Sequence, residues 1–217
     1  MNFFKNFFSK IERKEPEDYY VTKINQDSVL ENIYTCIKTK TPLIVGTTGW
    51  YGHLQKVKDA CLDNNATVMY GSNFSVGVNI FFQINQQVAK MMNKFSDQYD
   101  VGMEEIHHIH KLDSPSGTAI TIAEDILNEF EKKKQWVDVK ANEEGVTLHS
   151  PDHLIIESYR EGEVPGTHAV IYDSDVDRIE LKHGAHGRQG FALGAVLAAE
   201  WLASKKGFFS VKEMYDF

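Results

Sequence analysis

The segment KTPLIVGTTG, residues 40–49, carries the strongest indication of the fold. Its Leu43, Ile44 and Val45 form a short continuous apolar run, which is typical of a strand buried on both faces of a parallel sheet. Residues 46–49 then form a polar, glycine-containing loop directly after that strand. Open α/β sheets bind their ligands at this place, beyond the carboxyl ends of the strands.

Regular elements are expected on both sides of this stretch. The segment before it carries an apolar stripe at helical spacing, made of Val29, Leu30, Ile33, Tyr34 and Ile37. Ser28 and Glu31 have the form of a capping box at the start of that helix. A second helix through Leu54, Val57 and Cys61, a strand at residues 66–70 and a loop at 71–75 follow. This alternation predicts a doubly wound α/β sheet.

The second half of the chain has a different order of elements. We expect helices at residues 76–93, 117–134 and 191–204, and strands at residues 99–110, 154–159, 168–172 and 178–183. Runs of strands after helices indicate an α+β domain with a mixed sheet, one face of which is exposed or covered by a partner. The last helix is apolar nearly all round, so we expect it to be buried.

Composition and charge exclude several classes of protein. The chain has 217 residues with 23 basic and 31 acidic side chains, a net charge of −8, which disfavours nucleic-acid binding. No apolar run reaches the ~18–20 residues of a membrane span, and no signal-peptide pattern is present, so a membrane protein is not expected and the cytoplasm is the expected compartment. Two cysteines, Cys36 and Cys61, are too few for a disulfide framework and are expected to be buried thiols. The Phe/Lys-rich residues 1–20 predict an amphipathic helix that either docks on protein or lies on an anionic membrane.

Residues 104–118, EEIHHIHKLDSPSGT, hold the densest group of chemically competent side chains. Three histidines, His107, His108 and His110, precede Lys111 at the end of an expected strand, and a serine-rich turn then opens the next helix. A helix N-terminus offers unpaired N–H groups and a partial positive charge, which suit a carboxylate or phosphate. Histidine is the most common proton carrier in enzymes. The stretch therefore predicts an anion site beside acid–base groups.

Other interpretations of these residues stay open. A zinc site needs a third ligand beside His108 and His110, the two histidines that strand alternation places on one face, and none is obvious, so we expect no metal. The histidines could instead be structural, and residues 114–116 could serve only as a helix cap. The basic segment 182–188 is either a solvated loop or part of the site.

Together these motifs resemble the dihydrodipicolinate reductase family, the NAD(P)H enzymes of bacterial lysine and diaminopimelate synthesis. The family signature E-x-H-H-x-x-K-x-D-x-P-S-G-T-A is matched throughout residues 105–119, with Ser114 where alanine is usual. Further similar segments lie at residues 46–49 (G-T-T-G), 73–78 (N-F-S-x-G-V), 162–168 and 188–202. The resemblance covers residues 21–217.

The resemblance implies a role for each matching position. His107 is similar to the catalytic proton donor or acceptor, and Lys111 to a second proton donor. The positions that hold the dicarboxylate substrate match His108, Ser116, Gly117, Thr118 and Arg188. The positions that contact NADPH or NADH match Gly46, Thr47, Thr48, Gly71, Ser72, Asn73 and Phe74. The implied reaction is reduction of 4-hydroxy-tetrahydrodipicolinate to tetrahydrodipicolinate, by hydride transfer to C4 of the unsaturated ring and protonation of the adjacent carbon, in a homotetramer whose C-terminal sheets pack together.

One part of the family pattern has no match. Family members begin with a strand and a G-x-x-G-x-M-G loop that receives the cofactor's pyrophosphate, but the first glycine here is Gly46. A βαβ unit needs ~30 or more residues, more than remain between the Phe/Lys-rich segment and that glycine. We therefore expect an incomplete Rossmann-like sheet with an exposed edge in residues 1–74, a substrate-binding and tetramerisation domain in residues 75–187, and a C-terminal helix in residues 188–217 that returns to the first domain.

Three functional interpretations follow. The chain is a truncated reductase with a weakened cofactor site, a working reductase that uses the two remaining loops, or a catalytically impaired relative that binds a dicarboxylate or assembles with a partner. The family resemblance favours the reductase.

Overall fold

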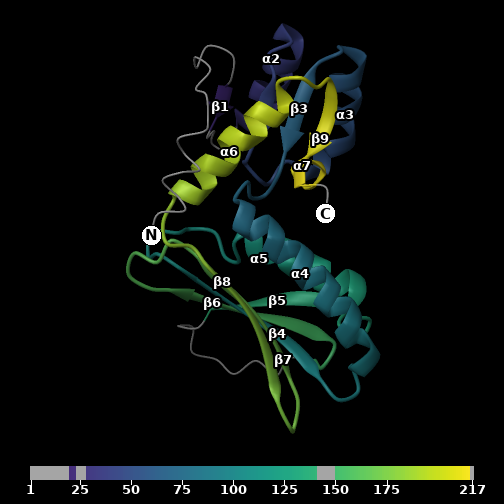
Figure 1. Cartoon of the computed structure of the whole chain (residues 1–217), viewed down its shortest axis with the longest axis vertical. Coiled ribbons are helices and arrows are strands. Elements are labelled where there is room, and N and C mark those ends of the chain that lie inside the picture. The colour runs from purple at the N-terminus through teal and green to yellow at the C-terminus, as the bar shows by residue number, and fades with distance from the viewer. Residues whose placement is uncertain (1–19, 23–27, 141–149, 216–217) are drawn as a thin grey trace, which may run out of the picture.

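The computed structural model describes residues 20–22, 28–140 and 150–215, and its first half is built on a parallel sheet (Figure 1). The strands of this sheet lie in the order β1-β2-β3-β9, all parallel. Their bounds are Tyr20–Thr22 for β1, Leu43–Val45 for β2, Thr67–Tyr70 for β3 and Gly207–Ser210 for β9. The expected amphipathic segment, residues 1–20, lies outside the described residues except for its last one.

Both faces of the parallel sheet are buried, as the apolar run of β2 predicts. Leu43 and Val45 face a core with helices α2 (Val29–Thr39) and α3 (Leu54–Asp63), which the short 3-10 helix η3 (Tyr51–His53) precedes. Ile44 faces the opposite way, into a core with α6 (Gln189–Leu202), next to which lies the short α7 (Lys212–Tyr215). Layers of helix, sheet and helix confirm the expected α/β architecture.

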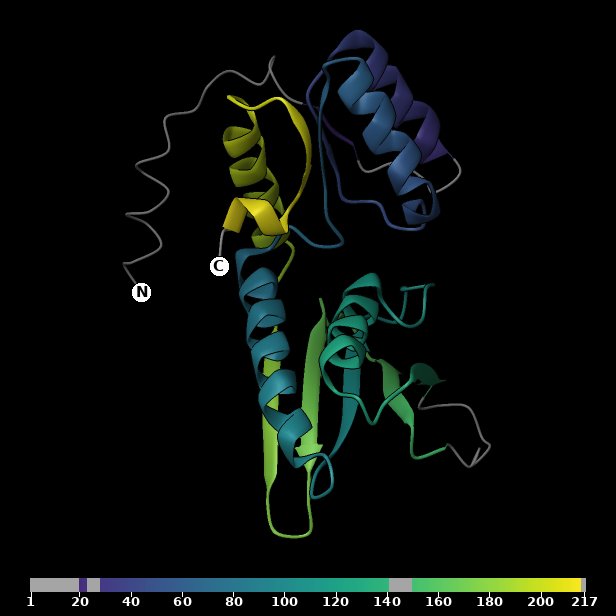
Figure 2. The ribbon, with the colours of Figure 1, turned by 90° about the vertical axis from the view of Figure 1, so that its right-hand side faces the viewer.

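The strands within residues 100–184 form a separate mixed sheet, with strand order β5-β6-β4-β7-β8. These strands span Gln135–Lys140 (β5), His153–Arg160 (β6), Asp100–His107 (β4), Thr167–Asp173 (β7) and Arg178–Gly184 (β8). Helices α4 (Val76–Met92) and α5 (Gly117–Glu129) pack on one face of this sheet (Figure 2), and the 3-10 helix η4 (Asn93–Phe95) follows α4. The opposite face lines a hollow of about 710 Å³.

Several expectations about local structure are wrong in detail. Strand β5 lies where no strand was expected, and α5 ends at Glu129 rather than near residue 134. Helix α6 is not buried all round, because Gly194, Ala198, Ala199 and Leu202 are buried but Val196 on another face is exposed. Ser28 stands at the N-cap of α2, but its side chain makes no capping hydrogen bond. Of the two free thiols, Cys61 is buried and Cys36 is only half-buried.

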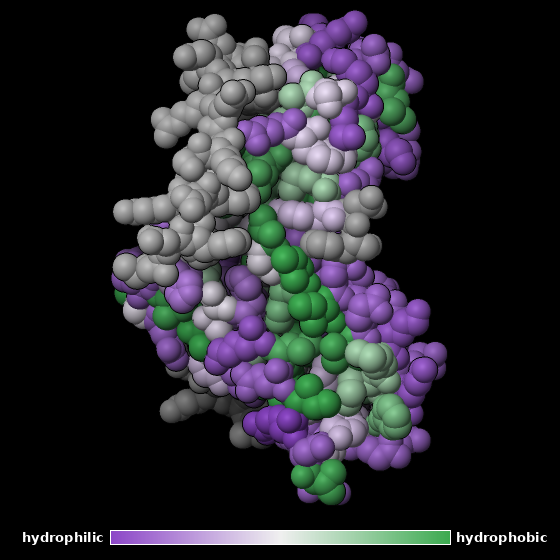
Figure 3. Space-filling view, viewed as in Figure 1, coloured by the Kyte–Doolittle hydropathy of each residue, from purple (hydrophilic) through white to green (hydrophobic). Residues whose placement is uncertain are grey.

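Helix α4 carries apolar side chains on its exposed side as well as on the side that faces the core. The hydrophobic band across the centre of Figure 3 follows this helix, and its exposed members include Ile80, Ile84 and Met91. Among the described residues, no helix combines the length and the apolar character that a membrane span requires.

Candidate functional site

A hollow of about 260 Å³ lies where the parallel sheet meets the mixed sheet. It contains most of the residues that the sequence singled out: Gly46, Thr48, Ser72, Asn73, His107, His108, Lys111, Ser116, Gly117 and Thr118. The loops after β2 and β3 form one side, and the end of β4 with the start of α5 forms the other. Residues far apart in the sequence thus converge on one cavity, as parallel-strand topology predicts.

Strand β4 supplies two of the ionisable side chains through its alternation. Val101, Met103, Glu105 and His107 all point toward the helix-covered face, so the last two continue the side of the strand that forms the core. The strand ends at His107, and His108 therefore lines the same hollow from the loop that follows. The ring of His110 lies beside that of His108, with 6.1 Å between the ring centroids, but the side chain is exposed and its Nε2 lies 3.2 Å from Oε1 of Glu163.

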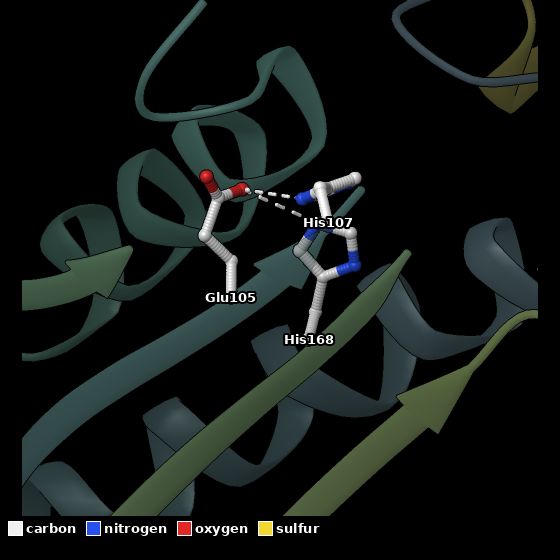
Figure 4. Close-up of side chains that lie close together, drawn as sticks. All are labelled: Glu105, His107 and His168. Carbon is white, nitrogen blue, oxygen red and sulfur yellow. Dashed lines mark ion pairs between the residues drawn. The ribbon is translucent and has the colours of Figure 1, made fainter. Parts of the chain in front are cut away.

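Glu105 is the centre of a buried ionic cluster (Figure 4). Its Oε1 lies 3.1 Å from Nη2 of Arg160, and its Oε2 accepts the backbone N–H of Ser116 at 3.1 Å. The same Oε2 lies 3.5 Å from Nδ1 of His107 and 3.7 Å from Nε2 of His168. A fully buried carboxylate requires such partners, because an unpaired buried charge costs several kcal/mol.

Strand register explains why these four side chains meet. Glu105 of β4 is paired with His168 of β7, and His107 of β4 is paired with Arg160 of β6. His168 is in turn paired with His183 of β8, which also lines the hollow. A polar row therefore crosses the end of an otherwise apolar sheet face.

Burial keeps both central histidines neutral near neutral pH. Desolvation lowers the pKa of His107 to about 4, with Lys111 and Arg160 acting in the same direction and Glu105 opposing them. Desolvation likewise lowers the pKa of His168 to about 3. A neutral imidazole carries one donor and one acceptor nitrogen, so each ring can both give and receive a hydrogen bond.

Lys111 supplies a cation at the wall of the hollow. Its Nζ donates to both carboxylate oxygens of Asp113 at 2.8 Å. Burial alone would raise the pKa of Asp113, but the hydrogen bonds and charge of Lys111, with the charge of Arg160, hold that pKa below its usual value. Lys111 is therefore held toward the hollow by a partner two residues away.

The start of α5 lines one side of the hollow. Ser116 caps the helix, its Oγ accepting the N–H of Ala119 at 3.1 Å. Thr118 accepts a hydrogen bond from Nδ2 of Asn73 at 3.1 Å, which joins the loop after β3 to α5. Gly117 packs so close to Thr48 that an added Cβ would lie 3.3 Å from its Cγ2. The two halves of the chain thus meet at a helix N-terminus suited to carboxylates.

Four predicted contact residues lie outside the wall of the hollow. Thr47 accepts the indole N–H of the buried Trp50, and Gly71 packs on Val211. Phe74 is buried in the core beside α6, and Arg188 is exposed at the N-cap of that helix. The expected ligand contacts of these four residues stay predictions.

Glu105, Arg160 and His168 were not among the predicted site residues. The basic segment 182–188, whose role was left open, does contribute His183 and Ala185 to the wall of the hollow. Glu105 and His168 stood within segments that match the family, but only spatial pairing shows what they contact. The alternation of β4, apolar at 101 and 103 and then polar at 105 and 107, was a usable signal for a polar end of the core face.

Glu105, His107 and His168 also form the one described group with the spacing of metal ligands. The contacts already made argue against a cation there, since Arg160 occupies Oε1 and the N–H of Ser116 occupies Oε2. Arg160 supplies the positive charge that a metal ion would otherwise bring. The expectation of no metal stays a prediction that this geometry favours.

Comparison with known proteins places the chain in a family. The sequence model for the C-terminal part of dihydrodipicolinate reductase matches residues 77–215. A 4-hydroxy-tetrahydrodipicolinate reductase of Christiangramia forsetii is 47% identical over 86% of this chain and 74% of its own length. The chain belongs to the 4-hydroxy-tetrahydrodipicolinate reductase family.

More distant members of the reductase family agree with this assignment. The reductase of Archaeoglobus fulgidus is 34% identical over 92% of this chain and 76% of its own length. The dipicolinate-bound dihydrodipicolinate reductase of Paenisporosarcina sp. TG-14 has the same fold, with a TM-score of 0.65 at 22% identity over 88% of this chain and 71% of that one.

Proposed function

We propose that this chain reduces 4-hydroxy-tetrahydrodipicolinate to tetrahydrodipicolinate with NADPH or NADH. The observation that carries the proposal is the convergence of His107 and Lys111, the N-terminus of α5 and the loops after β2 and β3 on one hollow. Family membership supports the same reaction. The assignment of roles to single residues is part of the proposal.

The substrate's two carboxylates are proposed to bind at the start of α5 and beside the cations. The N–H groups of the first turn, with Ser116, Gly117 and Thr118, offer donors to one carboxylate. Lys111 and His108 lie on the wall of the same hollow and offer charge and a ring donor to the second. A dianion entering here would also favour the charged form of His107, because a nearby negative charge stabilises an imidazolium.

His107 and Lys111 are proposed to supply the proton. The 4-hydroxyl must first leave as water, with a proton lost from the neighbouring carbon, and this gives the unsaturated ring. The nicotinamide, when bound, would supply the hydride that C4 of this ring receives. The carbon next to C4 then takes a proton from His107 or Lys111, so that one hydride and one proton are added across the double bond. Positioned proton donors of this kind are worth ~10²–10⁴ in rate.

The residues present fit only one end of a dinucleotide. Gly46, Thr48, Ser72 and Asn73 follow two adjacent parallel strands and are proposed to hold the nicotinamide and its ribose. The hollow, at about 260 Å³, lies below the ~300–1,000 Å³ of typical ligand sites, so a whole dinucleotide with substrate does not fit inside it. Since Gly46 is the first glycine of the sequence, residues 1–45 supply no glycine loop for the pyrophosphate.

A second candidate function rests on the small volume of the hollow, about 260 Å³. In this alternative the chain binds the dicarboxylate alone and acts as a dicarboxylate-binding or partner-assembling relative of the reductases. Calorimetric titration with NADH and with NADPH, each with 2,6-pyridinedicarboxylate present, separates the two candidates. Micromolar nucleotide binding followed by turnover supports the reductase. Dicarboxylate binding without nucleotide binding supports the alternative.

Assembly into a homotetramer through the open face of the mixed sheet is also part of the proposal. That face presents Val139, Ile155 and Ile171 among charged neighbours, a mixture suited to an interface between subunits. Light scattering should give a tetramer for the chain and a smaller species for Ile155→Arg. A monomeric chain would contradict the proposal.

The three-part division at residues 74 and 187, the cytoplasmic location and the absence of nucleic-acid binding stay predictions.

A further inference from the structure

We infer that Glu105 is a positioning residue, whose carboxylate holds the His107 ring with Nδ1 toward the protein and Nε2 toward the substrate. The inference deepens the proposed function, in which His107 handles the proton. It is carried by the buried contacts between Glu105, Arg160, Ser116 and the two histidines.

The carboxylate of Glu105 is itself fixed at both oxygens. Arg160 holds Oε1 at 3.1 Å and also donates to the carbonyl of Asp113 at 2.7 Å. The N–H of Ser116 holds Oε2 at 3.1 Å. With its side chain fully buried, the carboxylate has no water to turn toward. Its position is therefore set by the sheet and by the start of α5, not by its own rotamer freedom.

This carboxylate faces one particular nitrogen of His107. Nδ1 is buried and makes no hydrogen bond to any described residue, while Oε2 of Glu105 lies 3.5 Å away. That distance exceeds the 2.7–3.2 Å of a formed hydrogen bond, but catalytic hydrogen bonds are often long without substrate and shorten when it binds. An acceptor at Nδ1 favours a proton there, so the other nitrogen, Nε2, is left to exchange protons.

Space on the far side of the ring is kept open by Gly166. An added Cβ at this position would lie 3.1 Å from Nε2 of His107, and the φ of +148° there suits glycine. The ring is thus oriented by a charge on one edge and given room by a glycine on the other. Both features favour the ring orientation in which Nδ1 faces Glu105 and Nε2 faces the open space.

His168 connects this cluster to the anion site. Its Nε2 lies 3.7 Å from Oε2 of Glu105 and 3.1 Å from Oγ of Ser116, the residue that caps α5. One carboxylate therefore contacts the proposed proton carrier and the helix start that binds substrate. The carboxylate of Glu105 therefore fixes the position of the His107 ring relative to a substrate bound at Ser116.

The test uses the whole chain labelled with ¹⁵N at histidine, with His107 assigned by substitution. Nitrogen–proton correlation spectra at pH 7.5 report which ring nitrogen carries the proton. We expect Nδ1–H in the wild type. In Glu105→Gln the amide has one acceptor, which Arg160 takes, so the NH₂ group faces Nδ1 and the Nε2–H form should dominate. Glu163→Gln is the matched control, since it alters the exposed Glu163–His110 pair and should leave His107 unchanged.

Kinetics give a second, independent result. Glu105→Gln should lower kcat by about 10²-fold with KM changed less than about threefold, because the proton carrier is misoriented while the carboxylate donors remain. Glu105→Asp keeps the charge and should retain Nδ1–H and recover part of kcat. Since Glu105 raises the pKa of His107, the fall of activity at high pH should move to lower pH in the Gln variant.

Different failures have different meanings. A wild-type ring with the proton on Nε2 overturns the inference without any variant, even if no variant folds. An unchanged tautomer or unchanged kcat in Glu105→Gln overturns it as well, as does an equal loss in the Asp and Gln variants. Absence of turnover in the wild type would instead overturn the proposed function, and the spectra would still decide the role of Glu105.

Discussion

The two sheets differ in what their buried faces contain. The cores on the two faces of the parallel sheet are built of apolar side chains, with Leu43 and Val45 on one side and Ile44 on the other. The helix-covered face of the mixed sheet begins in the same way at Met103 and becomes ionic at Glu105, only two residues later. At the site, the inward-facing positions of the sheet carry ionisable side chains in place of apolar ones. Their charges are paired with side chains from neighbouring strands.

The largest expected effect comes from removing the proton carrier of the polar row. His107→Gln should lower kcat by ~10²–10⁴-fold with little change in KM, because the amide fills the space but cannot transfer the proton. Thr118→Val should instead raise KM, since it removes a hydroxyl from the proposed carboxylate site. Steady-state kinetics distinguish the two variants. An unaltered kcat in His107→Gln would remove histidine from the mechanism.

The packing of α6 tests the apolar core around the parallel sheet. A Cβ on Gly194 would lie 1.8 Å from the carbonyl oxygen of Phe74, so Gly194→Ala must shift the backbone after β3 and should cost about 3 kcal/mol. Gly190→Ala in the same helix meets only Oγ of Ser75 at 3.5 Å and should be neutral or stabilising by up to ~1 kcal/mol. Urea unfolding measures both. Equal effects would show that α6 does not pack as described.

Acid should lower the free energy of unfolding through the two buried histidines of the polar row. The pKa values of His107, about 4, and His168, about 3, lie below the ~6.5 of an unfolded histidine. The unfolded chain therefore binds more protons below pH 6.5, and the free energy of unfolding falls as the pH drops toward 4. Each histidine contributes up to ~1.4 kcal/mol per pH unit.

A variant of one buried histidine isolates that contribution. His168→Gln should reduce the slope of unfolding free energy between pH 6 and pH 5. Urea unfolding across this range provides the measurement. A slope in His168→Gln as steep as that of the wild type would contradict the burial of a neutral imidazole.

The smallest expected effect concerns Ser114, in the turn before α5. Ser114 donates to Oδ2 of Asp138 at 2.7 Å, and Ser158 donates to Oδ1 of the same carboxylate. Ser114→Ala should lower stability by about 1 kcal/mol. A double-mutant cycle with Ser158→Ala should show coupling, since both hydroxyls share Asp138. Strict additivity would show that the shared carboxylate does not link them.

Local patterns predicted most of the elements and failed where pairing decides. Strand β9 was missed because it has only four residues, and β5 because it begins at Gln135, directly after the stretch expected to be helical. Neither Gln135 nor Gly207 has a strong strand preference of its own. Their backbones become strands by pairing with β6 and β3. The all-round apolarity of α6 likewise predicted burial, but only one face of this helix has a sheet to pack on.

The candidate site divides in the same way. The motif at residues 105–119 and the two loops after β2 and β3 could be recognised from local sequence, because they depend on neighbouring residues and on the order of strands and helices. The contacts of Glu105 with Arg160 and His168, which lie far along the chain, became visible only in the folded structure. Strand register sets those contacts, and a buried carboxylate is stable only where register brings it a cation and donors.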